Sequence, residues 1–188
     1  MLLSSPDQER QLRHTRTITV AAYARTDGQW DLDAHLTDIK AQEAYYSTGM
    51  RPAGSAIHDL WLRITIDNNF TITQAEAAAD DMPFPGYCTE AHPSYKKMIG
   101  LSLMQGFRHN LHASLGGVLG CTHLTELAQI FPTAAIQAMA GDNKTQEKNA
   151  ESNSKRPFHI DRCYAMRIEG AAVAQFYPRW AVKPPTGS

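Results

Sequence analysis

Residues 30–40 read WDLDAHLTDIK and alternate between apolar and polar side chains. A strand shows this period of two when one of its faces is buried and the other is hydrated. The apolar face carries Trp30, Leu32, Ala34 and Leu36. The same parity puts Asp38 and Lys40 on that face. Either the strand ends near Leu36, or a polar pair faces the protected side at its end.

The flanking segments predict partner strands. Residues 17–25 (TITVAAYAR) are rich in β-branched and small side chains, which favours a strand, and Asp27-Gly28 is typical of a hairpin turn. Beyond a loop over 47–56, residues 57–67 (IHDLWLRITID) alternate again. His58 shares the parity of their aliphatic face, at its N-terminal end.

The next segment predicts a short strand and then a short helix. Residues 70–73 are expected to return as a strand after the turn at 67–69. Thr73 is expected to cap a helix over 74–79, because Glu76 occupies the capping-box position.

Two principal helices are predicted over about 94–115 and 122–140. In the first, apolar residues recur at a spacing of three to four, which gives one buried stripe, and Gly116-Gly117 ends it. Pro132 should kink the second helix or divide it into two.

The C-terminal part adds a linker and a last strand. Residues 141–156 (GDNKTQEKNAESNSKR) are too polar to pack, so we expect a flexible linker within a single domain spanning 1–188. Residues 163–177 are expected to form a returning strand. Strands followed by helices predict an α+β fold, with a mainly antiparallel sheet and the two helices packed on one face.

Composition narrows the class of protein. The chain has 188 residues, 43% of them hydrophobic and 20% charged, with a formal net charge of −1. A near-neutral balance argues against nucleic acid and anionic membranes as partners, and no apolar run is long enough to span a bilayer. The polar N-terminal segment and three dispersed cysteines suit a cytoplasmic protein. Nucleotide-binding glycine motifs, HExxH and GxSxG are missing from the sequence.

The strongest chemical signal is Gly120-Cys121-Thr122-His123. A helix that begins here would place Cys121 at its positive end, where backbone N–H groups stabilise a thiolate. His123 could be a metal ligand or an acid–base group near neutral pH. The structural alternative carries similar weight, because a free cysteine is often a small core residue.

Two further residues extend this pair into a predicted site. Cys88 follows the irregular Pro83-to-Gly86 turn, and His58 meets the core face at a strand end. Together with Cys121 and His123 they would supply the tetrahedral N/S ligand set that zinc prefers. Three ligands with an open fourth position, or chemistry without any metal, are alternatives.

Charged residues near the strand ends are candidate substrate-binding groups. The candidates for substrate binding are Lys40, Asp59, Arg63 and also Tyr87, which precedes Cys88. The candidates for catalysis are Asp38, His58, Cys121 and His123. Asp38, Lys40 and Arg63 could bind a carboxylate or phenolate or set the local field. The alternative is a set of solvated strand ends and structural salt bridges.

These residues also carry a family resemblance. The chain resembles a bacterial family, domain of unknown function 2889, from about Arg13 to the region before Tyr177. The matching motifs are His14-x-Arg16, Tyr23-Ala-Arg25-Thr-Asp27-Gly28, Leu36-x-Asp38-x-Lys40, Ile57-His58-Asp59-x-Trp61-x-Arg63, Pro85-x-x-Cys88, Gly100-Leu-x-x-x-x-Gly106-Phe107 and Gly120-Cys121-Thr122-His123-Leu124. The resemblance implies that His58, Cys88, Cys121 and His123 share a site. It implies little about activity beyond a weak association with bacterial catabolism of aromatic compounds.

Three functional hypotheses follow. The first is a small cytoplasmic enzyme, lyase-like or hydrolytic, that acts on a small organic molecule of partly aromatic character without a nucleotide cofactor. The second is a non-catalytic module in which the same Cys/His residues bind a divalent metal such as zinc, or a small molecule. The third is an assembly protein, including a homo-oligomer, in which the apolar stripe of helix 94–115 is exposed.

Overall fold

The computed structural model describes residues 3–140, 156–157 and 159–182. The chain separates into two compact units, Met1–Ala140 and Gly141–Ser188, and each is described by itself. The linker predicted over 141–156 lies outside the described residues except for Arg156. It stays a prediction, together with the single domain.

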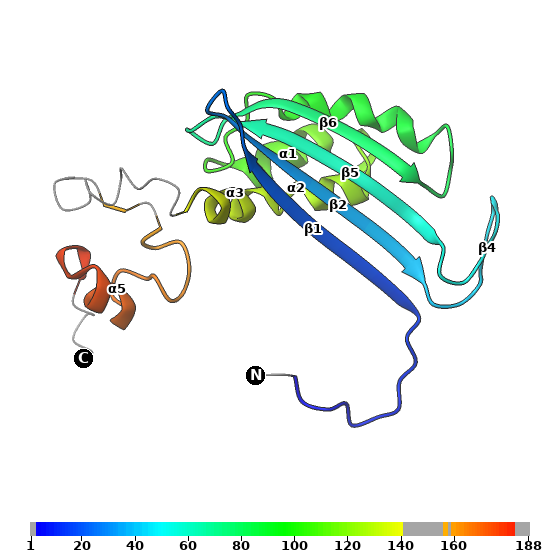
Figure 1. Cartoon of the computed structure of the whole chain (residues 1–188), viewed down its shortest axis with the longest axis horizontal. Helices are drawn as coiled ribbons and strands as arrows, with labels where there is room; N and C mark the ends of the chain where they lie inside the picture. Colours follow the sequence, from blue (N-terminus) through cyan, green and yellow to red (C-terminus); the bar gives the residue numbers. More distant parts are fainter. Residues whose placement is uncertain (1–2, 141–155, 158, 183–188) are drawn as a thin grey trace. The chain divides into compact units, whose positions relative to one another are not determined.

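The first unit is built on an antiparallel sheet of four strands in the order β1-β2-β5-β6 (Figure 1). Its strands are β1 (His14–Ala24), β2 (Trp30–Lys40), β5 (Ala56–Ile66) and β6 (Ile72–Asp81). A separate pair joins β3 (Ala44–Tyr46) to β4 (Gly49–Arg51). The predicted hairpin turn is confirmed, because Gly28 has φ +82° and Arg25 N–H donates to Gln29 O at 2.9 Å. The α+β class is likewise confirmed.

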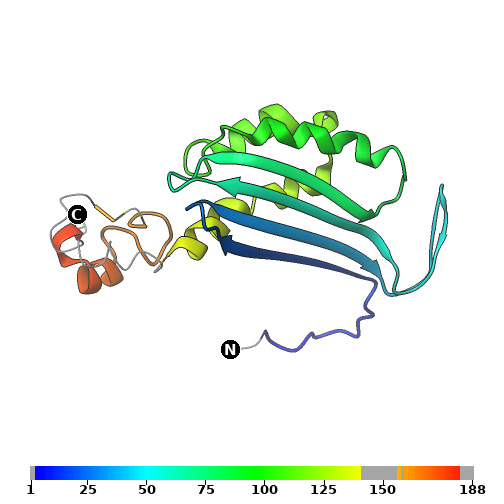
Figure 2. The ribbon, with the colours of Figure 1, turned by 45° about the horizontal axis from the view of Figure 1, so that its top comes forward.

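Helices cover one face of this sheet. The helical segments are η1 (Cys88–Met98), α1 (Phe107–Leu115), η2 (Gly117–Leu119), α2 (Thr122–Ala128) and α3 (Phe131–Met139), with η naming 3₁₀ helices. Helices α2 and α3 contact β2, and Figure 2 shows the helices on the same side of the strands. The aliphatic residues of β2 and β5 face them and are buried: Leu32, Ala34, Leu36, Leu60, Leu62 and Ile64.

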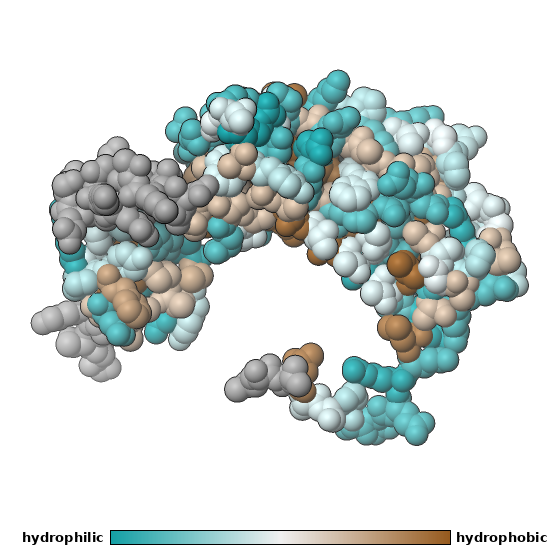
Figure 3. Space-filling view, viewed as in Figure 1, coloured by the Kyte–Doolittle hydropathy of each residue, from teal (hydrophilic) through white to brown (hydrophobic). Residues whose placement is uncertain are grey.

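The opposite face of the sheet is polar. It carries the alternate residues of the same strands, among them Asp33, which accepts two hydrogen bonds of 2.6 Å from Arg63. His35 stacks on Trp61 with the ring centroids 3.7 Å apart. The space-filling view, taken from the direction of Figure 1, shows hydrophilic residues mixed with weakly apolar ones over the strands (Figure 3).

The predicted helix over 94–115 is wrong in its continuity. Its N-terminal part belongs to η1 and its C-terminal part to α1, separated by a turn with Gly100 and Gly106 at φ +87° and +60°. The turn pairs with the backbone of Ile72 at the start of β6: Ile72 N–H donates to Leu101 O, and Gly100 N–H donates to Ile72 O. Hydrogen bonds to the sheet therefore replace helical ones. The apolar stripe is nevertheless buried, with Met98, Phe107 and Leu111 at most 3% exposed. The exposed interface that the third hypothesis needs is therefore not formed.

One further element prediction in this unit is wrong and one is confirmed. Residues 74–79 are strand rather than helix, because β6 pairs along β5 and turns Ala75, Ala77 and Ala79 toward the core. Pro132 does divide the second helix, since α3 begins at Phe131 with the proline in its first turn.

The second unit contains helices where the sequence predicts a strand. Within 163–177 the described backbone forms turns and then α5 (Ala171–Phe176), followed by η3 (Pro178–Trp180). In this unit Val173 is fully buried and Ile160 nearly so. No helix in the described part of the chain is long and apolar enough to cross a membrane.

Candidate functional site

The site begins with three side chains on adjacent strands. In the sheet register Arg16 of β1 pairs with Asp38 of β2, and Asp38 pairs with His58 of β5. Directly opposed residues in a sheet share a face, so all three point toward the helices. Asp38 is 2% exposed, which means that β2 ends with a polar group on its protected side rather than stopping at Leu36.

The Asp38 carboxylate is saturated by cationic and imidazole donors. Arg16 donates from Nε to Oδ1 and from Nη2 to Oδ2, both at 2.8 Å. His58 Nδ1 lies 3.0 Å from Oδ2, and His14 Nε2 lies 3.0 Å from Oδ1. Burial by itself would raise the pKa of Asp38, but the hydrogen bonds and charge of Arg16, assisted by His58, outweigh it and lower the pKa to about 2. Asp38 is therefore a fixed anion at neutral pH.

Two neutral imidazoles lie beside this anion. The rings of His58 and His123 are 3.8 Å apart between centroids and tilted by 37°. Burial lowers the pKa of His58, and the neighbouring His123 adds to the effect while Asp38 opposes it. Burial also lowers the pKa of His123, with the charge of Arg16 acting in the same direction. Because His58 Nδ1 must carry the proton that Asp38 accepts, the neutral ring has an unprotonated Nε2.

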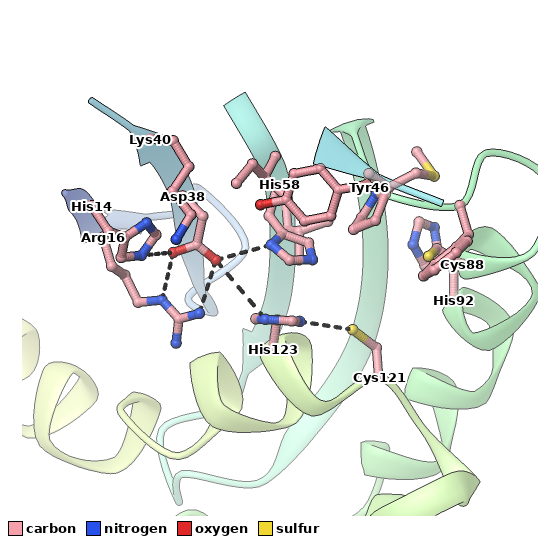
Figure 4. Close-up of a pocket in the computed structure, with 15 residues that line it drawn as sticks. His14, Arg16, Asp38, Lys40, Tyr46, His58, Cys88, His92, Cys121 and His123 are labelled. Atoms are coloured by element: carbon pink, nitrogen blue, oxygen red, sulfur yellow. Dashed lines mark hydrogen bonds and ion pairs between the residues drawn. The ribbon is translucent and has the colours of Figure 1, made fainter. Parts of the chain in front are cut away.

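Cys121 extends the arrangement on the other side of His123. Its Sγ is 4.0 Å from His123 Nδ1, and His123 Nε2 is 3.9 Å from Asp38 Oδ2. Thiol, imidazole and carboxylate thus follow one another in a row (Figure 4). Helix α2 begins at Thr122 with Cys121 as its N-cap residue, which confirms the predicted helix start.

The backbone of Cys121 is held from the protein interior. Tyr95 Oη accepts the Cys121 N–H at 3.1 Å and lies 2.8 Å from both Cys121 O and Thr125 Oγ1. Burial raises the pKa of Tyr95 to about 12, so it stays a neutral phenol. Gly120 precedes the cysteine because a Cβ there would lie 2.8 Å from Leu115 O and 3.2 Å from Tyr95 Oη. This network fixes the position from which the thiol projects.

These groups line a cavity of about 470 Å³. Figure 4 shows His14, Arg16 and Lys40 at one end and Cys88, His92 and Cys121 at the other, with His58 and His123 between them. Apolar side chains supply much of the remaining wall: Ile57, Leu60, Met82, Pro83 and Phe84. The cavity is large enough for a small organic molecule.

The structure brings most, but not all, of the predicted site residues together. Asp38, Lys40, His58, Cys88, Cys121 and His123 line the cavity. Three predicted substrate-binding residues do not. Asp59 and Arg63 lie on the opposite sheet face, bonded to His35 at 2.6 Å and to Asp33, and Tyr87 is 77% exposed. The strand parity that buries Leu60 and Leu62 necessarily turns Asp59 and Arg63 away from the cavity.

The group best placed to hold a metal also differs from the predicted set. Among the described residues, donor atoms of Asp38, His58 and His123 all lie within 4.8 Å of one another. Cys88 and Cys121 are not in this group, although both line the same cavity. Imidazole and carboxylate suit zinc and other divalent transition metals. Arg16 already occupies both oxygens of Asp38, which weakens the carboxylate as a ligand.

Four polar lining residues were not predicted as site residues: His14, Arg16, Tyr46 and His92. The signal for the first two was available. His14 and Arg16 alternate along the strand, and the hairpin turn at Asp27-Gly28 brings them opposite Lys40 and Asp38. Tyr46 comes from the small β3 strand and His92 from η1, for which the sequence offered no comparable pattern.

A family model matches residues 14–137, which contain all the cavity-lining residues, and its description is protein of unknown function (DUF2889). The chain belongs to the DUF2889 family. The resemblance inferred from the sequence motifs is thereby confirmed over residues 14–137, and its expected continuation toward Tyr177 lies outside the match. No curated protein and no solved structure matches the chain. We therefore infer function from the geometry of the DUF2889 region.

Proposed function

We propose that the protein is an enzyme that hydrolyses an ester or thioester bond in a small organic molecule, with Cys121 as nucleophile. The observation that carries the proposal is the row of Cys121 Sγ, His123 and buried Asp38 along one wall of the cavity. A nucleophile, a base within reach and a group that orients the base are the elements of nucleophilic acyl transfer.

Each residue has a separate role in this mechanism. His123 Nδ1 takes the thiol proton, and the Cys121 thiolate attacks the substrate carbonyl. The imidazolium then gives the proton to the leaving group, and water hydrolyses the resulting thioester. Asp38 stabilises the positive charge that His123 gains, and His58 is a second acid–base group. The separations of 4.0 and 3.9 Å are longer than catalytic hydrogen bonds, as is common without substrate.

The test is activity and adduct formation with chromogenic acyl esters and thioesters. We expect hydrolysis of p-nitrophenyl acetate and an acetyl group on Cys121, detected by mass spectrometry of the intact protein and its peptides. Cys121→Ser should lose the adduct and lower kcat/KM by at least about a hundredfold. The matched control is Cys163→Ser, since Cys163 is exposed and belongs to the second unit.

Two outcomes would count against a thiol nucleophile. Unchanged kcat/KM in Cys121→Ser would exclude it. Turnover without any covalent adduct, but with dependence on His58, would favour the lyase-like alternative, in which the imidazoles move protons only.

A second candidate is a metal-binding module. It is favoured by the approach of Asp38, His58 and His123 donor atoms to within 4.8 Å, and by the Asp38–His58 bond, because metal-ligating histidines usually donate their other N–H to a carboxylate. Elemental analysis of protein purified without an affinity metal separates the candidates. Stoichiometric zinc, lost in His123→Ala, would favour this module. A metal-free protein that forms the Cys121 adduct would exclude it.

The setting that we propose is the cytoplasm, with a small and partly aromatic molecule as substrate. The three cysteines are free in the structure, as they are kept in a reducing compartment. The apolar cavity wall with Phe84 suits an aromatic or other apolar body. The balanced net charge gives no support for nucleic acid as a partner.

A further inference from the structure

Lys40 is a cation without a partner in the cavity wall. It is half-buried at the end of β2, and its ammonium group forms no hydrogen bond or ion pair with another described residue. The other cation of the wall, Arg16, is fully engaged, because it bonds Asp38 and donates to Glu126 Oε2 at 2.6 Å. An ammonium group in a partly apolar cavity gains most from an anion that enters with the ligand.

A second polar group lines the same cavity. The Tyr46 hydroxyl also bonds no other described residue, and Figure 4 shows it directed toward the Lys40 side of the cavity. This end lies away from Cys121 and Cys88, and the apolar wall of Ile57, Met82 and Phe84 belongs to the same cavity. The cavity is therefore polar at one end, apolar along its wall and nucleophilic at the other end.

We infer that the Lys40 end binds the carboxylate of a small organic acid whose apolar body packs on the wall formed by Ile57, Met82 and Phe84. This inference rests on the proposed function and names its substrate class: a carboxylate-bearing ester or thioester, with the scissile carbonyl directed toward Cys121. Lys40 and Tyr46 are specificity residues that do not touch the reacting carbonyl.

The charge and geometry favour a carboxylate over a phosphate. A phosphate monoester carries close to two negative charges and is usually held by a guanidinium fork or several backbone N–H groups. Here the guanidinium of Arg16 is taken by two carboxylates, which leaves one ammonium and one hydroxyl. A single negative charge matches what remains.

The experiment measures binding of three probes to the full-length protein by NMR or calorimetric titration at fixed ionic strength. Benzoate tests the anion with its apolar body, benzamide is its neutral isostere, and phenyl phosphate tests the dianion. We expect benzoate to bind at least about tenfold more tightly than either of the other two, as a charge-assisted hydrogen bond in a shielded site would provide.

Variants locate the binding end. Lys40→Met should weaken benzoate binding by about tenfold or more and leave benzamide unchanged, whereas Lys40→Arg keeps the charge and should retain binding. The matched control is Lys97→Met, because Lys97 is exposed on η1 and does not line the cavity. Equal binding of benzoate and benzamide, tighter binding of phenyl phosphate, or unaltered benzoate affinity in Lys40→Met would overturn the inference.

Cys121→Ser distinguishes this inference from the proposed function. It should bind benzoate like the wild type, because the carboxylate end is remote from the thiol. If Cys121→Ser keeps its esterase activity while Lys40→Met loses benzoate, the nucleophile is wrong and the anion site stands. If Cys121→Ser loses activity while Lys40→Met binds benzoate normally, the nucleophile stands and the anion site is wrong.

Discussion

Asp38→Asn offers a quantitative test of the buried charge cluster. The cluster holds the pKa of Asp38 at about 2 against an ordinary value of 3.8. At about 1.36 kcal/mol for each pH unit, the ionised carboxylate stabilises the fold by about 2.5 kcal/mol at neutral pH. Asparagine keeps the shape of the side chain but not its charge, so this stabilisation should be missing from the variant.

The lowered pKa of Asp38 determines in which direction the unfolding free energy changes with pH. Because the pKa is lower in the folded state, the stabilisation is complete above pH 3.8 and is lost as the pH falls toward 2. Between pH 5 and pH 3 the wild type should lose about 1 kcal/mol from this residue alone, while Asp38→Asn loses nothing at this position. The difference in unfolding free energy between the two proteins should therefore shrink by about 1 kcal/mol over that interval.

Urea unfolding at pH 7, 5, 4 and 3 measures this difference. Asp7→Asn is the control, since Asp7 is exposed in the segment before β1. A wild-type-minus-variant difference that stays constant from pH 5 to pH 3 would refute the reasoning. So would a variant as stable as the wild type at pH 7.

Three further predictions concern the surroundings of the site. Tyr95→Phe leaves the partly buried Cys121 N–H without its acceptor; it should lower the unfolding free energy by about 1–3 kcal/mol and change the rate of Cys121 alkylation by iodoacetamide. Gly120→Ala should be destabilising by a similar amount, measured by urea unfolding, because its Cβ meets Leu115 O. Gly54→Ala is the comparison: its Cβ would meet no atom, so any destabilisation there comes from backbone strain and not from crowding. Arg63→Leu should change stability by at most about 1 kcal/mol and leave kcat/KM unchanged, because Arg63 lies across the sheet from the cavity; a large fall in kcat/KM would restore its predicted role in substrate binding.

The strands could be predicted where the pattern had one interpretation. The alternation in β2 and β5 placed Asp38 and His58 on the core side, and both line the cavity on that side. The same parity already turned Asp59 and Arg63 outward, so their grouping with Asp38 relied on charge where parity was the better guide.

Elements with ambiguous local signals were the ones predicted wrongly. The alanines of β6 suit a helix as well as a strand, and pairing with β5 decides between them. The apolar spacing of 94–115 continues through Gly100 and Gly106, although both adopt a left-handed backbone that interrupts the helix. Long-range hydrogen bonds settled both cases, and periodicity does not report them.

The site depended on register as well as on motif. Gly120-Cys121-Thr122-His123 is visible as a motif, whereas the contact of His123 with Asp38 requires α2 to lie over β2. The pairing of Asp38 with His58 depends on the register of β2 with β5, which shifts at a bulge just beyond it, between Asp38 and Ile39, and no short-range pattern specifies that bulge.

The edge strand β1 contributes to the site by charge rather than by buried surface. Almost every residue of β1 is exposed, yet Arg16 joins Asp38 of the neighbouring strand to Glu126 of α2, the helix that carries His123. A chain that lost this strand would keep the apolar centre formed by β2, β5 and the helices, but its deepest carboxylate would have no guanidinium. Through Arg16, the strand thus links the sheet to the helix by ion pairs. Insertions or fusions before His14 that displace β1 should abolish the activity of the site without unfolding the protein.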